Sequence, residues 1–369
     1  MKKYLYLFAT LILAAACGQD TLTVKGTIAE GETFPEDQLV YLVDGKTALD
    51  SAAVINGQFE LKAPANPEKR YGIVANYRDR APRDRNWTYG IIAEKGTSQV
   101  TFAPKSSDCS VTGSKINQAL AEFDDQINAI TDEYREKAEA ISDDDEAAGE
   151  ALYEETMGKI KEASLAAIEK NPDNYIARYA LQNIIYDLSL EELDGILAKC
   201  GKFVSDDEAI SRIHSCKIAE QETAEGKPFV DFAGKTPEGA DIKLSDIVGK
   251  GKWVLADFWA SWCGPCMREI PNIKRTHETL AGDKFTVLGV AVWDGDEDGG
   301  NTKSADRMKE KEMTWPQIFV GNDKTPTDKY GITGIPTMIL FAPDGTIYKR
   351  GESLRGAKMM ETVRDIINQ

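Results

Sequence analysis

The stretch that decides the fold is Asp257-Phe258-Trp259-Ala260-Ser261-Trp262-Cys263-Gly264-Pro265-Cys266-Met267-Arg268-Glu269. The apolar run before it, residues 253–256, predicts a buried strand, and residues 270–280 after it have the apolar spacing of a helix. Cys263 and Cys266 therefore lie where a strand leads into a helix. Two cysteines with this spacing on the first turn of a helix are close enough to form a disulfide.

The position of Cys263 at a helix N-terminus favours an ionised thiol, because unpaired backbone N–H groups and the helix dipole stabilise an anion there. The thiolate is the nucleophilic form of cysteine. A zinc site would need further ligands, and the only histidines, His214 and His277, are far apart in the sequence. A structural disulfide is disfavoured because the turn is tight and exposed. Redox chemistry is the favoured interpretation.

These residues carry a resemblance to a known family. Residues 257–266 resemble the active-site signature of the thioredoxin superfamily. Glu269, Pro271 and the later Gly334-Ile335-Pro336-Thr337 resemble the TlpA-like/ResA-like branch of bacterial thiol-disulfide oxidoreductases, with a domain of the AhpC/TSA-redoxin type. The resemblance covers about the last 140 residues, a normal size for one domain. It implies a C-terminal thioredoxin-like α/β fold.

The resemblance also implies roles for the residues of the motif. Cys263 would attack a substrate disulfide and Cys266 would resolve the mixed disulfide that forms. Trp262, Gly264 and Pro265 would lie against the substrate. The redox-active disulfide would be the only reactive group, with no cofactor and no metal.

A second segment, Ile335-Pro336, is expected to face the disulfide. In the family this peptide bond is cis, a form found almost only before proline. The backbone of Ile335 would pair with an extended substrate segment. An ordinary trans proline in a loop is the alternative.

Two carboxyl groups are candidates for proton transfer. Asp257 is predicted to be buried in the strand before the motif, and Glu269 follows Cys266 by three residues. Burial raises the pKa of a carboxyl group, so one of these two could accept the proton of Cys266 near neutral pH. The alternatives are a satisfied buried acid for Asp257 and a charge on a helix face for Glu269.

The N-terminus predicts export. Lys2 and Lys3 precede an apolar stretch, residues 4–16, which is too short to span a bilayer and ends in small residues before Cys17. This resembles a bacterial lipoprotein signal, in which Cys17 carries the lipid. A plain secretory signal and a soluble periplasmic protein are the alternative. Either way the chain reaches a compartment where disulfides form.

Length and composition set the domain organisation. A chain of 369 residues predicts two or three domains, and its net charge of −17 argues against a nucleic-acid partner. We divide it into a signal peptide, a β-sandwich-like domain, an α-helical segment and a thioredoxin-like domain, at residues 1–16, 17–113, 114–225 and 226–369.

The segment 17–113 has alternating apolar residues, which predict an antiparallel β sandwich or barrel. Asn56-Gly57 is a hairpin signal within one run, residues 53–61. The domain resembles the uncharacterised β domain of exported Bacteroidetes proteins. The other predicted strands are residues 22–28, 38–43, 71–75 and 99–102.

The segment 114–225 has the apolar spacing of four or five helices and contains most of the net negative charge, which we attribute to solvated faces. Breaks are predicted at residues 142–145 and 171–173, and a further helix start at Ser189. An aromatic stripe is interpreted as core rather than as a peptide groove: Tyr175, Tyr179 and Tyr186.

The last domain is predicted to begin with a hairpin of residues 229–232 and 242–244 and to continue as alternating strands and helices. The acidic run 294–299 imitates the start of a calcium loop but has Ala305 at position twelve, so a solvated turn is preferred. The remaining predictions are strands 253–259, 285–292, 338–341 and 347–349 and helices 264–281, 304–312 and 357–367.

Three further cysteines, Cys109, Cys200 and Cys216, leave at least one free thiol. A Cys200–Cys216 bridge is possible, but small buried apolar residues are the favoured interpretation.

The predicted function is reduction of protein disulfides in the periplasm or cell envelope, with recharging by a membrane electron-donor protein. An oxidase or isomerase using the same cysteines is the first alternative, and a membrane-attached binding protein with a secondary redox site is the second. A peroxidase is disfavoured because Ala260 occupies the position of the threonine in a Thr-x-x-Cys pattern.

Overall fold

The computed structural model describes residues 20–32, 34, 38–75, 88–103, 109–142, 145–297 and 299–369. The predicted signal peptide and Cys17 lie outside them. The chain forms two compact units, one of residues up to Asp187 with Gly195–Asp207 and one of Leu188–Asp194 with Glu208–Gln369. The domain limits given above stay a prediction.

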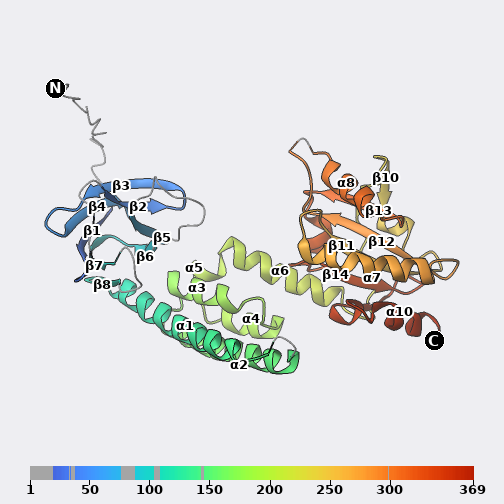
Figure 1. Cartoon of the computed structure of the whole chain (residues 1–369), viewed down its shortest axis with the longest axis horizontal. Coiled ribbons are helices and arrows are strands. Elements are labelled where there is room, and N and C mark those ends of the chain that lie inside the picture. The colour runs from blue at the N-terminus through green and yellow to red at the C-terminus, as the bar shows by residue number, and fades with distance from the viewer. Residues whose placement is uncertain are drawn as a thin grey trace, which may run out of the picture. The chain divides into compact units, whose positions relative to one another are not determined.

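The first unit begins with two four-stranded sheets, in the orders β4-β1-β7-β8 and β3-β2-β5-β6 (Figure 1). Neighbouring strands are antiparallel except β1 and β7, which are parallel. One hydrophobic cluster contains residues of both sheets, among them Leu22, Leu42 and Ile73. The predicted sandwich is therefore confirmed. Its strands are β1 Thr21–Ile28, β2 Leu39–Asp44, β3 Thr47–Ala53, β4 Gln58–Pro64, β5 Asn66–Ala75, β6 Thr88–Ala93, β7 Gly96–Phe102 and β8 Ser110–Thr112.

The Asn56-Gly57 turn is confirmed, and its hairpin is short. Both turn residues have positive φ, 52° and 74°, and Ile55 and Gln58 exchange two backbone hydrogen bonds of 2.9 and 3.0 Å. Beyond this bridge the flanking strands separate, because β3 pairs with β2 and β4 pairs with β1.

The helical segment contains six helices in the described part of the chain, more than the four or five expected. Side chains cap them at the predicted breaks: Asp145 caps α2, and Asn174 caps α3. Ser189 and Glu192 form a reciprocal pair of side-chain-to-backbone bonds at the start of α4. The helices are α1 Lys115–Glu139, α2 Glu146–Lys170, α3 Tyr175–Ile184, α4 Leu190–Leu197, α5 Lys202–Ser205 and α6 Glu208–Glu222.

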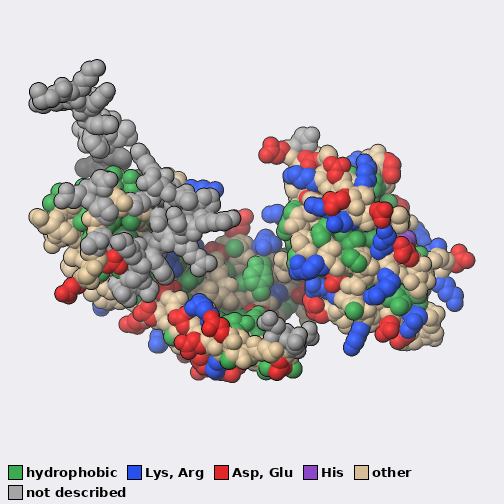
Figure 2. Space-filling model, viewed as in Figure 1, with side chains coloured by type: hydrophobic (Ala, Val, Ile, Leu, Met, Phe, Trp, Pro, Cys, Tyr) green, Lys and Arg blue, Asp and Glu red, His purple; other side chains and the backbone are tan. Residues whose placement is uncertain are grey.

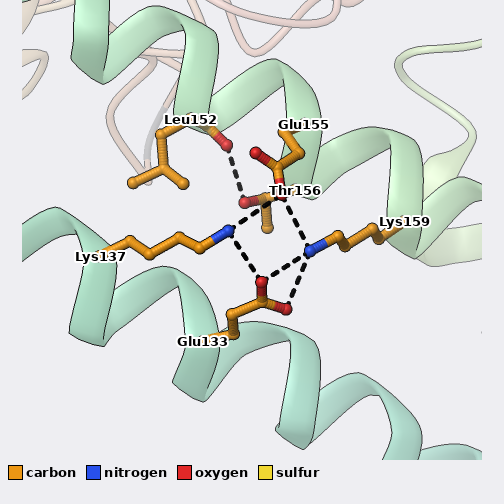
Figure 3. A network of polar contacts seen from close by, with 6 residues as sticks. All are labelled: Glu133, Lys137, Leu152, Glu155, Thr156 and Lys159. Atoms are coloured by element: carbon orange, nitrogen blue, oxygen red, sulfur yellow. Dashed lines mark hydrogen bonds and ion pairs between the residues drawn. The ribbon is translucent and has the colours of Figure 1, made fainter.

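An ion-pair network joins α1 to α2 (Figure 3). Lys137 and Lys159 each contact both Glu133 and Glu155, at 2.8 to 3.0 Å. Hydrogen bonds from the two lysines lower the pKa of Glu133 to about 2. Since the network is exposed, it contributes little to stability, and the acidic helices are solvated as predicted. Tyr186, interpreted above as core, is instead 59% exposed.

The second unit contains a seven-stranded sheet in the order β10-β9-β13-β12-β11-β14-β15 (Figure 1). The central strands β11, β12 and β13 are parallel, and β14 and β15 continue the sheet antiparallel. This is the predicted thioredoxin-like α/β arrangement. Its elements are β9 Ala233–Lys235, β10 Asp241–Lys243, β11 Trp253–Trp259, α7 Gly264–Leu280, β12 Phe285–Val292, α8 Thr302–Glu310, β13 Gln317–Gly321, α9 Thr325–Lys329, β14 Thr337–Phe341, β15 Ile347–Arg350 and α10 Met359–Ile367.

Side chains of β11 alternate between two hydrophobic clusters. Leu255 and Trp259 lie in the cluster that contains Cys266 and residues of α7 and α10. Val254 and Phe258 lie in the cluster on the other face. β11 is thus covered on both faces, which explains its nearly continuous apolar sequence.

Two elements of this unit were missed and one was misplaced. β13 and α9 are too short to give a clear periodic pattern. The first strand of the predicted hairpin is β9, Ala233–Lys235, and residues 229–232 form no strand. Phe232 is buried against Phe258 and Tyr330. The apolar residues in the sequence 229–232 therefore reflect packing in the core and not pairing in a strand.

Helix α6 belongs to the second unit rather than to the first. Gly331 approaches it so closely that a Cβ there would lie 2.3 Å from the carbonyl oxygen of Cys216. The guanidinium of Arg350 donates to Thr223 at the end of α6 and to the carbonyl oxygen of Tyr330, at 3.0 to 3.1 Å. These contacts fix α6 against the thioredoxin-like sheet.

Cys200 and Cys216 form no disulfide with each other, so the alternative of a Cys200–Cys216 bridge is excluded. Cys216 is buried as expected, whereas Cys109 and Cys200 are partly exposed.

No helix of the described residues is long and apolar enough to span a membrane. In Figure 2, side chains of both signs are mixed over the visible surface of the second unit.

Candidate active site

Cys263 and Cys266 form a disulfide at the start of α7. Cys263 is the N-cap residue, and its sulfur accepts a hydrogen bond of 3.1 Å from the backbone N–H of Cys266. Pro265 stands in the first turn, where its missing N–H has no intrahelical acceptor to lose. Both cysteines are at most 3% exposed, so the neighbouring residues cover most of the disulfide.

The approach is bounded by Trp262 and by the segment Ile335-Pro336. Trp262 is 62% exposed, and its indole N–H donates to the carbonyl oxygen of Trp293 at 3.0 Å. The Ile335–Pro336 bond is cis, as predicted. The carbonyl oxygen of Ile335 lies 3.8 Å from Sγ of Cys263. Residues more than 70 positions apart in sequence therefore meet at one sulfur.

Asp257 is a buried acid without a hydrogen-bonding partner. It is 1% exposed, and neither carboxylate oxygen has a hydrogen-bond partner among the described residues. By alternation along β11 it faces the side of the sheet where α7 lies. Burial, with a smaller contribution from the charge of Glu269, raises the pKa of Asp257 to about 7. A group with this pKa can exchange a proton at neutral pH.

Glu269 interacts electrostatically with this buried acid. It is partly buried on α7, and its Oε2 accepts hydrogen bonds from the backbone N–H of Gly356 at 2.9 Å and from Asn272 at 3.3 Å. The nearby Arg355 partly offsets the rise in the pKa of Asp257. Three charged groups thus interact on this face of the sheet, and only Glu269 and Asp257 were expected from the sequence.

The sequence analysis missed Asp294, which holds the active-site turn. It is 3% exposed, so the description of residues 294–299 as a solvated turn is wrong at this position. Its carboxylate accepts hydrogen bonds from the backbone N–H and the hydroxyl of Ser261, both at 2.8 Å, and from the hydroxyl of Ser304 at 2.6 Å. The acidic run concealed this role, because only the fold brings Asp294 to Ser261.

Replacing Asp294 by Ala should destabilise the protein by about 3 kcal/mol, because the partly buried N–H of Ser261 and two hydroxyl groups would lose their charged acceptor. Chemical denaturation measures this, and reduction of disulfides should slow as the turn loosens. Glu297→Ala is the matched control, since Glu297 is an exposed acid of the same loop. Equal stability of the two variants would contradict the assigned role.

The structure brings together the predicted Trp262, Cys263, Pro265, Cys266 and Ile335-Pro336, with Gly264 exposed in the turn. Asp257 lies in β11, before the cysteines, and Glu269 lies in α7, after them. The described residues contain no group of three or more His, Cys, Asp or Glu side chains placed to hold a metal ion. The geometry offers a disulfide, a nearby backbone acceptor and a proton-exchanging carboxyl group.

Two known families match the chain. The AhpC/TSA family matches residues 226–350, and a domain of unknown function, DUF4369, matches residues 22–120. Among solved structures, the thioredoxin domain of a thiol-disulfide oxidoreductase from Bacteroides vulgatus has 28% identity and a TM-score of 0.35, over 39% of this chain and 99% of that one.

Curated relatives match the same C-terminal region. The thiol-disulfide oxidoreductase ResA of Bacillus subtilis is 29% identical over 140 residues, 37% of this chain and 73% of its own length. ResA of Geobacillus thermodenitrificans is 30% identical over 126 residues, 34% of this chain and 68% of its own length. Fold and site thus define a thioredoxin-like oxidoreductase. Within that class, the chain belongs to the ResA-like thiol-disulfide oxidoreductases.

Proposed function

We propose that this chain reduces disulfide bonds of proteins in the periplasm or cell envelope by dithiol-disulfide exchange. The observation that supports the proposal most strongly is the Cys263–Cys266 pair at the N-terminus of α7, with the carbonyl group of Ile335 beside the first sulfur. In the reduced protein, Cys263, the neighbour of exposed Trp262, would be the thiol that attacks the substrate.

The reaction proceeds in two exchanges. The thiolate of Cys263 attacks one sulfur of the substrate disulfide, that bond breaks, and the other substrate sulfur leaves as a thiolate. The thiolate of Cys266 then attacks Sγ of Cys263 and releases the second substrate thiolate. The two electrons that reduce the substrate come from the two thiols of the enzyme, which ends as the disulfide.

The second exchange requires that Cys266 lose a proton. We assign Asp257 as the acceptor, because its pKa of about 7 lets it take a proton at neutral pH and return it later. Glu269, which is partly exposed, would pass that proton to solvent. Trp262, Gly264 and Pro265 would contact the substrate, and the backbone of Ile335 would pair with its extended chain.

The remaining parts of the proposal concern the surroundings of the enzyme. A membrane electron-donor protein of a thiol-reducing pathway would return two electrons to the Cys263–Cys266 disulfide. A lipid on Cys17 would attach the chain to the membrane, and mass spectrometry of the mature N-terminus checks this. A plain periplasmic form is the alternative.

The reduction potential of the Cys263–Cys266 couple tests the direction of electron flow. A reductant should have a potential close to or below that of the thioredoxin class, about −270 mV. Equilibration with glutathione and dithiothreitol buffers, followed by thiol alkylation, measures it. A potential near −120 mV would instead indicate an oxidase. Failure of the reduced protein to transfer electrons to any disulfide would contradict the proposal as a whole.

A further inference from the structure

A pocket of about 490 Å³ opens beside the redox centre within the second unit. Its lining includes Arg212 from α6, Trp293 from the loop after β12, Lys324 and Asp328 at α9, and Thr333 before the cis-proline. The helix that carries Arg212 lies outside the region matched by the AhpC/TSA family.

Two residues that line the pocket are linked to the active site. The carbonyl oxygen of Trp293 accepts the indole N–H of Trp262, the neighbour of Cys263. Thr333 precedes Ile335 by two residues, and the carbonyl oxygen of Ile335 lies 3.8 Å from Sγ of Cys263. Since an extended chain advances about 3.3 Å per residue, we expect a substrate bound at Cys263 to meet this pocket within a few residues of its cysteine.

The walls of the pocket are held in place. Arg212 lies one helical turn before Cys216, where α6 meets Gly331 in backbone contact. Trp293 has a φ of 54°, in the left-handed region that residues other than glycine rarely adopt, and its indole N–H donates to Thr327 at 3.3 Å. Residues held in such conformations cluster at functional sites.

The lining of the pocket has more cationic than anionic side chains. Arg212 and Lys324 are exposed, and neither forms an ion pair with a described residue. Asp328 is the single acidic side chain of the lining. In a chain with a net charge of −17, two cations without an ion pair in the lining of one pocket form a local site for a carboxylate.

We propose that this pocket binds the segment of a substrate protein next to its reactive cysteine, and that Arg212 and Lys324 select segments containing Asp or Glu. The inference rests on the proposed function, since a substrate lies in the pocket only while its sulfur is at Cys263. It makes α6 a part of the substrate-binding surface and names the substrate class as proteins with an acidic sequence beside the disulfide.

Three disulfide-bonded peptides test this, identical except that Glu, Ser or Lys occupies the three positions next to the cysteine. The reduced protein should reduce the Glu peptide with a kcat/KM about tenfold above that of the Lys peptide at low ionic strength. Salt at 0.5 M should shrink that ratio, because the charges are exposed. Arg212→Glu should abolish or reverse the preference.

The control is Lys250→Glu, which makes the same type of charge change at an exposed residue preceding β11, at the opposite end of that strand from Cys263. For this variant, the ratio of the kcat/KM values for the Glu and Lys peptides should equal that of the wild type. Lys324→Glu repeats the test if Arg212→Glu unfolds at a lower denaturant concentration than the wild type.

Equal kcat/KM values for the three peptides in the wild type would overturn this inference and leave the proposed function intact. Loss of the preference in Lys250→Glu as well would also overturn it, because the selection would then follow from net charge. If the wild type reduced neither the peptides nor a small aromatic disulfide, the proposed function itself would fail.

Discussion

Cys266→Ser should accumulate a covalent complex with its substrate, because a serine hydroxyl cannot attack Sγ of Cys263 to release it. Turnover should fall by at least about a thousandfold, as expected when a member of a nucleophilic pair is lost. Incubation of the reduced variant with a disulfide-bonded protein, followed by electrophoresis without reductant and mass spectrometry, should show the adduct.

The reciprocal variant, Cys263→Ser, should lose the same turnover without forming the adduct, since Cys266 acts only as the resolving thiol in the proposed order of attack. Both variants are best made with alanine at Cys17, Cys109, Cys200 and Cys216, so that an adduct has one possible site. Equal trapping by the two variants would show that the assigned order of attack is wrong.

Asp257→Asn should stabilise the oxidised protein in a pH-dependent manner. The pKa of Asp257 is about 7 in the folded protein against an ordinary 3.8, so the folded state binds more protons and the wild type loses stability as pH rises between these values. The gain in the free energy of unfolding should therefore be near zero at pH 4 and about 4 kcal/mol at pH 8. Urea denaturation across this range measures it.

The same substitution should slow disulfide reduction at pH 7 by about a hundredfold, because the proton acceptor for Cys266 is lost. Glu269→Gln is the comparison: it removes one contributor to the raised pKa of Asp257 but keeps its burial, so a smaller stability change is expected. A stability gain in Asp257→Asn without any loss of rate would exclude Asp257 as the acceptor.

The core of the redox unit could be predicted because its signals are local. The apolar run of β11, the helical spacing of α7 and the two cysteines between them lie within one continuous stretch. The cis peptide bond before Pro336 followed from family resemblance alone. Asp257 was predicted as buried because it stands inside an apolar strand.

Other parts of the site depend on contacts that no local pattern encodes. In the sequence, Asp294 cannot be distinguished from the other acids of the run 294–299. Only the fold brings its carboxylate to the backbone N–H and hydroxyl of Ser261. Arg355 and Gly356 meet Asp257 and Glu269 only through the return of the chain after β15. The strands β3 and β4 share a correctly predicted turn, yet their partners are decided by packing of the whole sandwich.

The anchoring of α6 has a consequence for how this protein could be shortened or recombined. The side chain of Arg350 is 14% exposed and depends on Thr223 for two of its acceptors. A boundary drawn at Gly226, where family similarity begins, would strip those acceptors away and expose the backbone around Gly331 to water. A fragment that keeps these contacts therefore starts near Glu208. A chimaera joined further downstream would leave the guanidinium of Arg350 without two of its acceptors.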